Sequence, residues 1–265
     1  MEGSVIYSLI ESKENNQIKY VVKLATDSKF RKASQQSVIY GYHLIEEAAK
    51  HQLLAKLYIN ESNLTDYEKL IAKYNLIDRT VLVIDKIMDK MNLLDSATDC
   101  VGLINISQKE LLVSHDESYI LLENIQDPGN LGTIFRVARA GGINNVVLSP
   151  KSVDPYNPKV LRASQGIQFG LNIFTDIDLE QFISSYHGQA LAMIPDAAGS
   201  IYEVNLNIPT AIVLGNEGNG LTEKLKSKLT NHVSIPMCGD AESLNLAMAA
   251  TVAVFEMSRQ RIMKS

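Results

Sequence analysis

Short apolar runs alternate with segments of helical periodicity along most of this chain of 265 residues. In the first half, the apolar runs predict three strands, over Leu54–Ile59, Thr80–Ile84 and Val101–Ile106. The periodic segments between them predict three helices, over Val38–Lys50, Thr65–Tyr74 and Lys86–Leu94. Strands that alternate with helices are typical of an α/β layer with a largely parallel sheet. The first half is therefore predicted to be a small α/β domain.

The second half shows the same alternation more strongly. Its predicted strands are Tyr119–Ile125, Asn145–Ser149, Asn172–Thr175, Gln189–Ile194, Thr210–Leu214 and His232–Pro236. Its predicted helices are Leu131–Ala140, Pro158–Phe169, Leu179–Tyr186, Thr222–Leu229 and a long last one over Leu244–Arg261. Ligands of an open α/β sheet bind beyond the carboxyl ends of the strands. A functional site is therefore expected in the loops that follow these strands.

A polar and charged stretch, Lys109–Ser118, separates the two halves. We therefore predict two domains, residues 1–112 and 113–265, and the length is about right for two at ~150 residues each. The net charge of −5 excludes a protein that coats nucleic acid by bulk positive charge. Residues 126–170 nevertheless contain five basic against two acidic side chains, a local excess that fits either a polyanion or a solvated surface.

The cysteines and histidines exclude several kinds of site. Cys100 and Cys238 show no CxxC spacing, which argues against a cysteine-based zinc site or a disulfide scaffold and fits a reducing cytoplasm. The five histidines show no metal-ligand spacing, so no metal is expected. No apolar run approaches the ~18 residues of a membrane span, and the first residues show no signal-peptide pattern. A cytoplasmic protein without membrane association is expected.

Three loops contain residues suited to act on a ligand. The first, Asn124–Asn130, leads into a helix on which Arg136 and Arg139 share one face. Asn130 is expected to cap this helix. Asn130 and Arg136 both lie near the ligand end of the sheet, while a solvated basic face is the alternative explanation for the two arginines.

The second loop, Leu214–Gly220, contains three glycines, which let the backbone approach a ligand closely. Its GxxGxG order is neither the GxGxxG dinucleotide fingerprint nor a phosphate loop. A tight turn between strand and helix explains the glycines but does not explain Glu217. The carboxylate of Glu217 favours a neutral or cationic ligand over a phosphate.

The third loop, Ile235–Asn245, runs into the last helix. Ser243 is expected to cap that helix, whereas Asn245 in the first turn has no structural need that the sequence reveals. The helix itself is rich in alanine, which permits close packing inside the fold or across a subunit interface. A fourth stretch, Lys159–Gly166, adds Arg162 to the basic residues.

Together these loops resemble the three motifs of the SpoU (TrmH-like) family of RNA 2′-O-ribose methyltransferases, within the SPOUT trefoil-knot superfamily. The matching segments within Tyr119–Arg261 are, in order, NLGTIFRVARAGG, VLGNEGNGLT and IPMCGDAESLNLAMAATVAVFE. VLRASQGI resembles the stretch between the first two motifs, and Gln165 departs from the apolar residue of many members. More weakly, VIYGYHLIEEAAK and SATDCVGLINI resemble the substrate-binding domain of the ribosomal-RNA members, which is similar in fold to a family of ribosomal RNA-binding proteins.

The resemblance implies a small α/β substrate-binding domain followed by a SPOUT α/β domain with a deep C-terminal trefoil knot. It implies methyl transfer from S-adenosylmethionine to a ribose 2′-hydroxyl in RNA, and a homodimer through the knot region. The extra N-terminal domain favours ribosomal RNA as the substrate. Three alternatives stay open: transfer-RNA ribose methylation, a non-catalytic RNA-binding protein of the same fold, and a different nucleotide-using α/β enzyme.

Carried over to this chain, the resemblance assigns cofactor binding to the backbone of five residues: Leu214, Gly215, Ile235, Met237 and Leu244. Arg136 matches the central arginine of the first motif, which is sometimes assigned as the base in this family. A guanidinium, with a pKa above ~12, is a poor base at neutral pH. Arg136 is therefore expected to stabilise the developing alkoxide and to bind the adjacent phosphate.

The remaining site residues are expected to support this reaction. Asn130 would orient Arg136 or the ribose, and Arg162 would bind a phosphate. Three residues are expected to shape the pocket: Glu217, Ser243 and Asn245. Stacking and phosphate contacts are how looped RNA is read, and seven of the eleven tyrosines lie in the first 74 residues, although a small core also explains them. RNA binding by this domain is assigned to three clustered basic residues: Lys29, Arg31 and Lys32.

Overall fold

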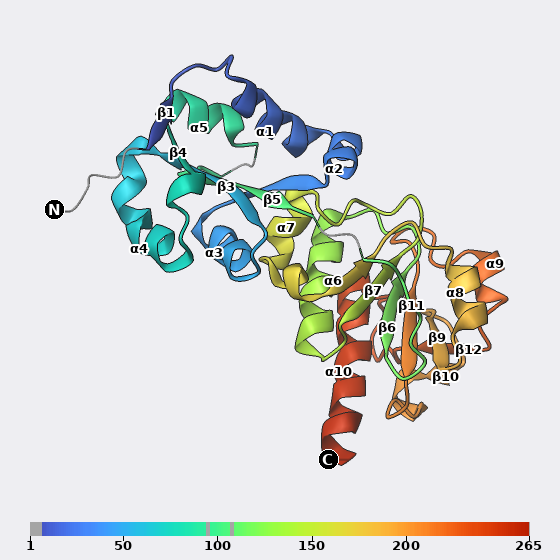
Figure 1. Cartoon of the computed structure of the whole chain (residues 1–265). Coiled ribbons are helices and arrows are strands. Elements are labelled where there is room, and N and C mark those ends of the chain that lie inside the picture. The colour runs from blue at the N-terminus through green and yellow to red at the C-terminus, as the bar shows by residue number, and fades with distance from the viewer. Residues whose placement is uncertain (1–6, 94–95, 107–108, 265) are drawn as a thin grey trace. The chain divides into compact units, whose positions relative to one another are not determined.

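The computed structural model describes residues 7–93, 96–106 and 109–264 (Figure 1). The chain divides into two compact units. Unit 1 comprises residues 1–107 and 156–169, and unit 2 comprises residues 108–155 and 170–265. Residues 156–169, which the sequence pattern assigned to the second domain, therefore group with unit 1. The domain boundary at residue 112 stays a prediction.

Unit 1 contains a five-stranded sheet with the strand order β1-β4-β3-β5-β2. The strands are β1 (Ser8–Ile10), β2 (Gln36–Tyr40), β3 (Leu54–Asn60), β4 (Thr80–Val83) and β5 (Cys100–Asn105). The helices are α1 (Asn16–Thr26), α2 (Ser28–Ser34), α3 (Tyr42–Lys50), α4 (Leu64–Tyr74), α5 (Asp85–Met91) and α7 (Pro158–Ser164). β5 runs antiparallel to β2 and β3, so the sheet is mixed and the prediction of a largely parallel one is wrong.

The predicted helix over Val38–Lys50 is confirmed from Tyr42 onward, where α3 lies, and is wrong over its first residues, which belong to β2. Gly41 separates the two elements with a φ of +88°, a left-handed conformation that glycine adopts without strain. Successive side chains of β2 point to opposite faces of the sheet. Ile39 packs against α3 and α4, whereas Val38 and Tyr40 pack against α1 and α5. Helices therefore cover both faces of this sheet.

Unit 2 contains a seven-stranded sheet in the order β10-β12-β9-β11-β6-β7-β8, with every neighbouring pair parallel. The strands are β6 (Tyr119–Leu122), β7 (Asn145–Leu148), β8 (Asn172–Phe174), β9 (Gln189–Met193), β10 (Gly199–Ser200), β11 (Thr210–Leu214) and β12 (Asn231–Ser234). The helices are α6 (Pro128–Ala140), α8 (Leu179–Ser185), α9 (Glu223–Lys226) and α10 (Leu246–Lys264). The predicted α/β architecture of the second half is confirmed, while the trefoil knot stays a prediction.

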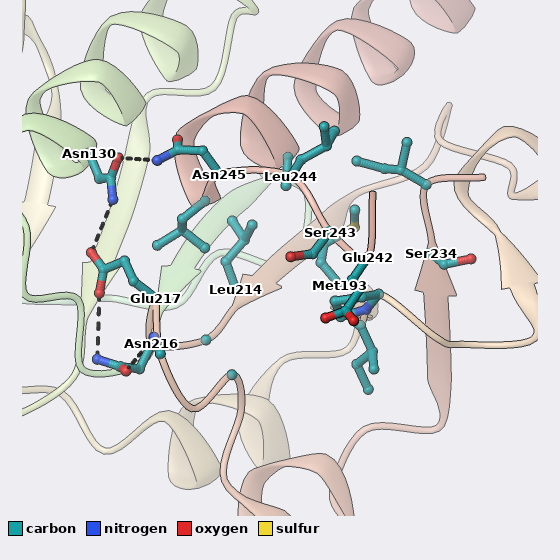
Figure 2. Close-up of a pocket in the computed structure, with 18 of the residues that line it drawn as sticks. Asn130, Met193, Leu214, Asn216, Glu217, Ser234, Glu242, Ser243, Leu244 and Asn245 are labelled. Atoms are coloured by element: carbon teal, nitrogen blue, oxygen red, sulfur yellow. Dashed lines mark hydrogen bonds between the residues drawn. The ribbon is translucent and has the colours of Figure 1, made fainter. Parts of the chain in front are cut away.

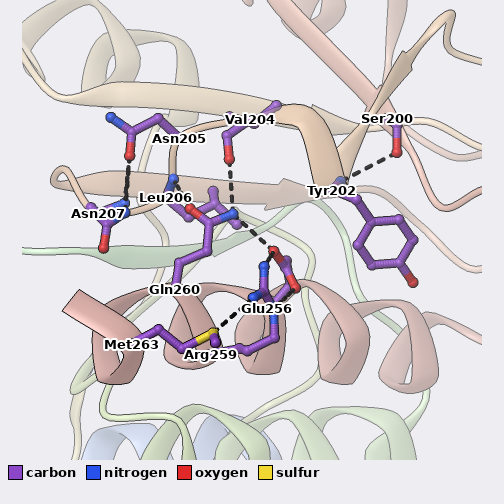
Figure 3. A network of polar contacts seen from close by, with 10 residues as sticks. All are labelled: Ser200, Tyr202, Val204, Asn205, Leu206, Asn207, Glu256, Arg259, Gln260 and Met263. Atoms are coloured by element: carbon purple, nitrogen blue, oxygen red, sulfur yellow. Dashed lines mark hydrogen bonds and ion pairs between the residues drawn. The ribbon is translucent and has the colours of Figure 1, made fainter. Parts of the chain in front are cut away.

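The long last helix, α10, is attached to the rest of unit 2 by partly buried hydrogen bonds (Figure 3). The side chain of Gln260 donates to the Val204 carbonyl at 3.0 Å and accepts from the Leu206 N–H at 2.8 Å. Glu256 is buried and accepts hydrogen bonds from Gln260 at 2.8 Å and from Arg259 at 2.7 Å. The buried carboxylate of Glu256 is thus satisfied, as buried polar groups generally are. Within the described ranges, no helix is both long and apolar enough to cross a membrane.

Close packing of α6 against α10 depends on a glycine at the end of α6. A Cβ atom built on Gly141 would collide with Cγ1 of Val254 on α10. Gly141→Ala is therefore expected to lower the free energy of unfolding by about 1–3 kcal/mol, the usual cost of overpacking. Urea unfolding followed by circular dichroism measures this difference.

Gly239→Ala is the matched control for this variant. No heavy atom lies within 4 Å of a Cβ built on Gly239, so its stability is expected to change by less than about 0.5 kcal/mol. Equal unfolding midpoints for the two variants would contradict the packing of α6 on α10.

Candidate functional site

A cavity of about 470 Å³ lies at the carboxyl ends of β9, β11 and β12 in unit 2 (Figure 2). These three strands are neighbours in a parallel sheet, so the loops that follow them converge at one edge. The loop before α10 and Asn130 of α6 complete the lining. The volume falls in the ~300–1,000 Å³ range of small-molecule sites. Among the described residues, no group of three or more His, Cys, Asp or Glu side chains is suited to hold a metal ion.

The carboxylate of Glu217 connects the loop after β11 to the loop before α6. It accepts hydrogen bonds from the backbone N–H groups of Gln126 and Asp127, at 3.2 and 3.1 Å. The side-chain amide of Asn130 donates to it at 3.3 Å. Partial burial acts to raise the pKa of Glu217, but these N–H donors outweigh burial and the pKa is lowered overall. The ionised carboxylate is thus the form that holds the two loops together.

The loop after β11 folds back on itself in a way that two glycines permit. Asn216 and Gly220 exchange two backbone hydrogen bonds of 2.9 Å, and Gly220 has a φ of +65°. A side chain on Gly215 would collide with the backbone of Gly220 and Leu221. Asn216 then donates from its side chain to the Asn124 carbonyl at 2.9 Å, which adds a second connection between the loops.

Asn130 does not cap α6 as expected. The cap is Asp127, whose side chain accepts from the Asn130 N–H at 2.7 Å. Asn130 therefore lies in the first turn of the helix, and its side chain is available for other contacts. Its amide nitrogen donates to Glu217, and its oxygen accepts from the side chain of Asn245 at 3.0 Å.

Asn245 has the capping role that was expected of Ser243. Its side-chain oxygen accepts from the backbone N–H groups of Ala247 and Met248, at 2.9 and 3.3 Å, at the start of α10. The expected cap at Ser243 is wrong, and Asn245 has a clear structural need that the sequence did not reveal. The amide nitrogen of Asn245 meanwhile contacts Asn130, so one side chain both caps a helix and shapes the cavity wall.

The comparison with known families identifies the unit that holds this cavity. The sequence model of the SpoU rRNA Methylase family matches residues 117–255, just over half of the chain. The chain belongs to the SpoU rRNA Methylase family. A second model, for an MRM3-like substrate binding domain, matches residues 15–96.

Relatives and solved structures agree with SpoU membership over nearly the whole chain. An uncharacterized tRNA/rRNA methyltransferase of Synechocystis is 31% identical over 262 residues, which cover 95% of this chain and 94% of the relative. The 23S rRNA (guanosine(2553)-2′-O)-methyltransferase RlmP of Bacillus subtilis is 30% identical over 254 residues, which cover 94% of this chain and 98% of the relative. The crystal structure of the AdoMet-bound rRNA methyltransferase from Sinorhizobium meliloti superposes with a TM-score of 0.83 at 25% identity, covering 96% of this chain and 98% of that one. The resemblance inferred from the motifs is confirmed, as is the fold class of a substrate-binding domain followed by a SPOUT α/β domain; the knot stays a prediction.

The cavity brings together most of the site residues expected of a SpoU protein. All five expected cofactor-binding residues line it: Leu214, Gly215, Ile235, Met237 and Leu244. Four of the five expected catalytic residues also line it: Asn130, Glu217, Ser243 and Asn245. Arg136 is not in the lining; it is exposed on α6 and has no hydrogen bond or ion pair with any described residue. Arg162 is exposed on α7 in unit 1.

The lining residues that sequence reasoning missed include Met193, Ser234 and Glu242. Met193 and Ser234 are the last residues of β9 and β12, so the rule that ligands bind at strand ends was the signal that pointed to them. Glu242 directly precedes Ser243 inside the third motif.

The three basic residues of α2 do not share one environment. Lys29 and Lys32 are exposed, but Arg31 is only 3% exposed. The guanidinium of Arg31 donates to the carbonyls of Leu24 and Ala25 near the end of α1, at 2.7 and 3.3 Å. The expected RNA contact of Arg31 is therefore wrong, because its guanidinium is buried inside unit 1 and binds backbone there.

The lowered pKa of Glu217 predicts a pH-dependent contribution to stability. A carboxylate whose pKa is lower in the folded state stabilises the fold above its unfolded value of ~4.3 and loses that effect as the pH falls through the folded value. Glu217→Gln keeps the shape of the side chain and removes its negative charge. We expect it to lower the melting temperature at neutral pH, with the difference from the natural chain shrinking as the pH falls below about 4.

Thermal unfolding of both chains across this pH range measures the effect. Glu223→Gln is the control, because Glu223 is exposed and forms only a surface ion pair with Lys226 at 2.8 Å. Such pairs contribute little, so this variant is expected to follow the natural chain at every pH. If the melting temperature of Glu217→Gln stayed below that of the natural chain by the same amount down to low pH, the charge of Glu217 would not be what holds the two loops together.

Proposed function

We propose that this chain is an S-adenosylmethionine-dependent RNA methyltransferase that modifies a ribose 2′-hydroxyl in ribosomal RNA. Membership of the SpoU rRNA Methylase family supports the proposal, as do the names of the Bacillus subtilis and Sinorhizobium meliloti proteins. The observation that carries it is the cavity itself, where residues of all three motifs meet: Asn130, Leu214, Glu217, Ser243 and Asn245.

The residues around the cavity fit S-adenosylmethionine. Four apolar side chains offer surface for an adenosine: Leu214, Ile235, Met237 and Leu244. The charged residues of the described lining, Glu217 and Glu242, are both acidic. Such a lining favours a cofactor with a cationic sulfonium and disfavours the phosphates of ATP or NAD, because opposite charges attract and like charges repel at these distances. This counts against a different nucleotide-using enzyme.

When bound, S-adenosylmethionine supplies an electrophilic methyl group on its sulfonium. The protein has to position the ribose hydroxyl in line with that methyl group and exclude water, and positioning alone lowers the barrier by several kcal/mol, roughly 7–11 in well-oriented cases. Asn130 and Asn245 fix one another through their side chains beside Glu217, which gives the cavity wall preorganised amide groups. We assign the orientation of the ribose to these amides.

Arg136 is assigned to the charge that develops on the ribose. As the 2′-hydroxyl loses its proton, the guanidinium stabilises the alkoxide and binds the neighbouring phosphate through its fork of N–H donors. Its exposure on α6, with no partner among the described residues, leaves those donors available. Arg162 is assigned to a second phosphate, and Lys29 and Lys32 to RNA contacts of the substrate-binding unit.

A homodimer with a shared active site is part of this proposal. Arg136 does not line the cavity of its own chain. The helix α10 exposes four large apolar side chains: Met248, Phe255, Ile262 and Met263, at 60%, 48%, 72% and 76%. Exposed apolar surface on the helix that packs against α6 fits a subunit interface there. Such an interface lets Arg136 serve the cavity of the other protomer. A cytoplasmic location accords with a ribosomal RNA substrate.

Methyl transfer from radiolabelled S-adenosylmethionine to separated unmodified ribosomal and transfer RNAs tests the reaction and the substrate. Alkali needs a free 2′-hydroxyl to cleave RNA, so a 2′-O-methyl group leaves an uncleaved dinucleotide. Label in alkali-resistant dinucleotides from ribosomal RNA is the expected result. Label in mononucleotides would mean base methylation and overturn the chemistry, and label on transfer RNA alone would replace the substrate. Cofactor-independent RNA binding without transfer would favour a non-catalytic RNA-binding protein.

Arg136→Ala is expected to reduce methyl transfer by at least about 100-fold, the usual loss when a donor to developing charge is removed. Cofactor affinity, measured by calorimetry, should stay within a few-fold because Arg136 does not line the cavity. Arg139→Ala is the matched control on the same helix, since the Arg139 side chain only donates to Asn144 at 2.6 Å. A large loss of cofactor binding in Arg136→Ala would contradict its assigned role.

Mixed dimers test whether the active site is shared. Co-expression of an Arg136→Ala chain with an Asn130→Ala chain assembles dimers in which one cavity has both its own Asn130 and the other chain's Arg136. If the site is shared, two inactive variants together regenerate methyl transfer, measured on dimers purified through two different tags. If each chain uses its own Arg136, the mixed dimer stays as inactive as its parents.

A further inference from the structure

The two carboxylates in the cavity lining differ in their surroundings. Glu217 accepts hydrogen bonds from Gln126 and Asp127 in the loop before α6 and from Asn130 in the first turn of α6, so its carboxylate already has protein partners. Glu242 also lines the cavity, yet no described residue donates a hydrogen bond to its carboxylate or forms an ion pair with it. An acidic side chain in a ligand cavity, with no partner of its own, is suited to meet a cationic group of the ligand.

The two carboxylates also lie at different ends of the cavity (Figure 2). Glu217 is grouped with Asn130 and Asn245, and Glu242 lies across the cavity beside Met193. The amides of Asn130 and Asn245 mark the first of these ends as the one where the ribose hydroxyl is oriented. The opposite end then receives a part of the cofactor that does not react.

We infer that Glu242 binds the α-ammonium group of the methionine part of S-adenosylmethionine. This inference rests on the proposed function. The cofactor has two cationic groups, and its sulfonium has to lie at the reacting end because it holds the methyl group that is transferred. The ammonium group lies at the far end of the methionine side chain, and its three N–H donors need acceptors. The carboxylate of Glu242 is the charged acceptor available at that end of the described lining.

The effect of Glu242 on the ammonium group can be distinguished from an effect on the sulfonium by comparing related nucleosides. Loss of the methyl group removes the sulfonium charge but leaves the ammonium, so Glu242 is expected to hold the substrate S-adenosylmethionine and the product S-adenosylhomocysteine equally. 5′-Methylthioadenosine has the adenosine and the sulfur but neither cation. Its binding is expected to be independent of Glu242.

Isothermal titration calorimetry of the full-length chain with these three nucleosides tests the inference, and it needs no RNA or turnover. Glu242→Gln keeps the size of the side chain and removes its charge. We expect a loss of about fivefold or more in affinity for both S-adenosylmethionine and S-adenosylhomocysteine, as for a partly exposed charge-assisted hydrogen bond. The affinity for 5′-methylthioadenosine should not change.

Asp240→Asn is the matched control, because Asp240 lies on the same loop, is exposed and is not part of the cavity lining. It should leave all three affinities unchanged, which excludes a general effect of negative charge on this loop. Glu242→Asp should retain part of the selectivity for the two amino-acid-bearing nucleosides.

Each other outcome overturns the inference in a recognisable way. A loss confined to S-adenosylmethionine would assign Glu242 to the sulfonium, and an equal loss for all three nucleosides would assign it to the adenosine. No loss for any of them would mean that Glu242 does not contact the cofactor. Failure of the natural chain to bind any of the three nucleosides would instead refute the proposed function, so the two failures are distinguishable.

Discussion

The cavity depends on the hydrogen bonds that the Glu217 carboxylate accepts from the loop before α6. β6 and β11 are parallel neighbours, so their carboxyl ends lie at the same edge of the sheet, but strand pairing does not fix the loops beyond that edge. The ionised carboxylate of Glu217 connects these loops by accepting hydrogen bonds from Gln126, Asp127 and Asn130. A hydrogen bond to a charged acceptor is stronger than one between neutral groups. The lowered pKa of Glu217 is the electrostatic consequence of the same contacts. The loop after β11 and the loop that leads into α6 are thus one structural unit.

Two side-chain amides connect Glu217 to the last helix. Asn130 donates to Glu217 and accepts from Asn245, and Asn245 in turn caps α10. The geometry of the cavity wall is therefore tied to the packing of α6 against α10, where Gly141 allows the two helices to approach. Supporting a site on helices whose positions are fixed by packing is the general way to keep reactive groups within a fraction of an ångström of their working geometry. Stability and site geometry depend here on the same side chains.

The sequence predicted the architecture of unit 2 and most of the cavity lining, because the strands of a buried parallel sheet are distinct apolar runs and ligands bind where they end. It did not predict which residues cap the helices. Asp, Asn and Ser are similarly good caps, so Asp127 and Asn130, or Ser243 and Asn245, are not distinguished by residue type. The choice depends on where the chain leaves the helix, which tertiary contacts decide.

Two other errors arose because contacts made by distant residues are invisible in a local pattern. The apolar run after Val38 is compatible with strand or helix, and only the left-handed Gly41 divides it. Arg31 is followed by the basic residue Lys32 in a polar stretch, yet the guanidinium of Arg31 turns inward and donates to carbonyl groups at the end of α1.

The position of Arg136 could not be predicted from its motif. Asn130 and Arg136 lie in one motif and on one helix, but only Asn130 lines the cavity of the chain. The motif alone does not show which of its residues lie together in the folded chain. Under the proposed function, either the substrate or a second protomer has to complete the site with the solvent-facing Arg136. The exposed apolar side chains of α10, the helix packed against α6, favour a second protomer. The homodimer proposed above accounts for both the exposed position of Arg136 and the uncovered face of α10.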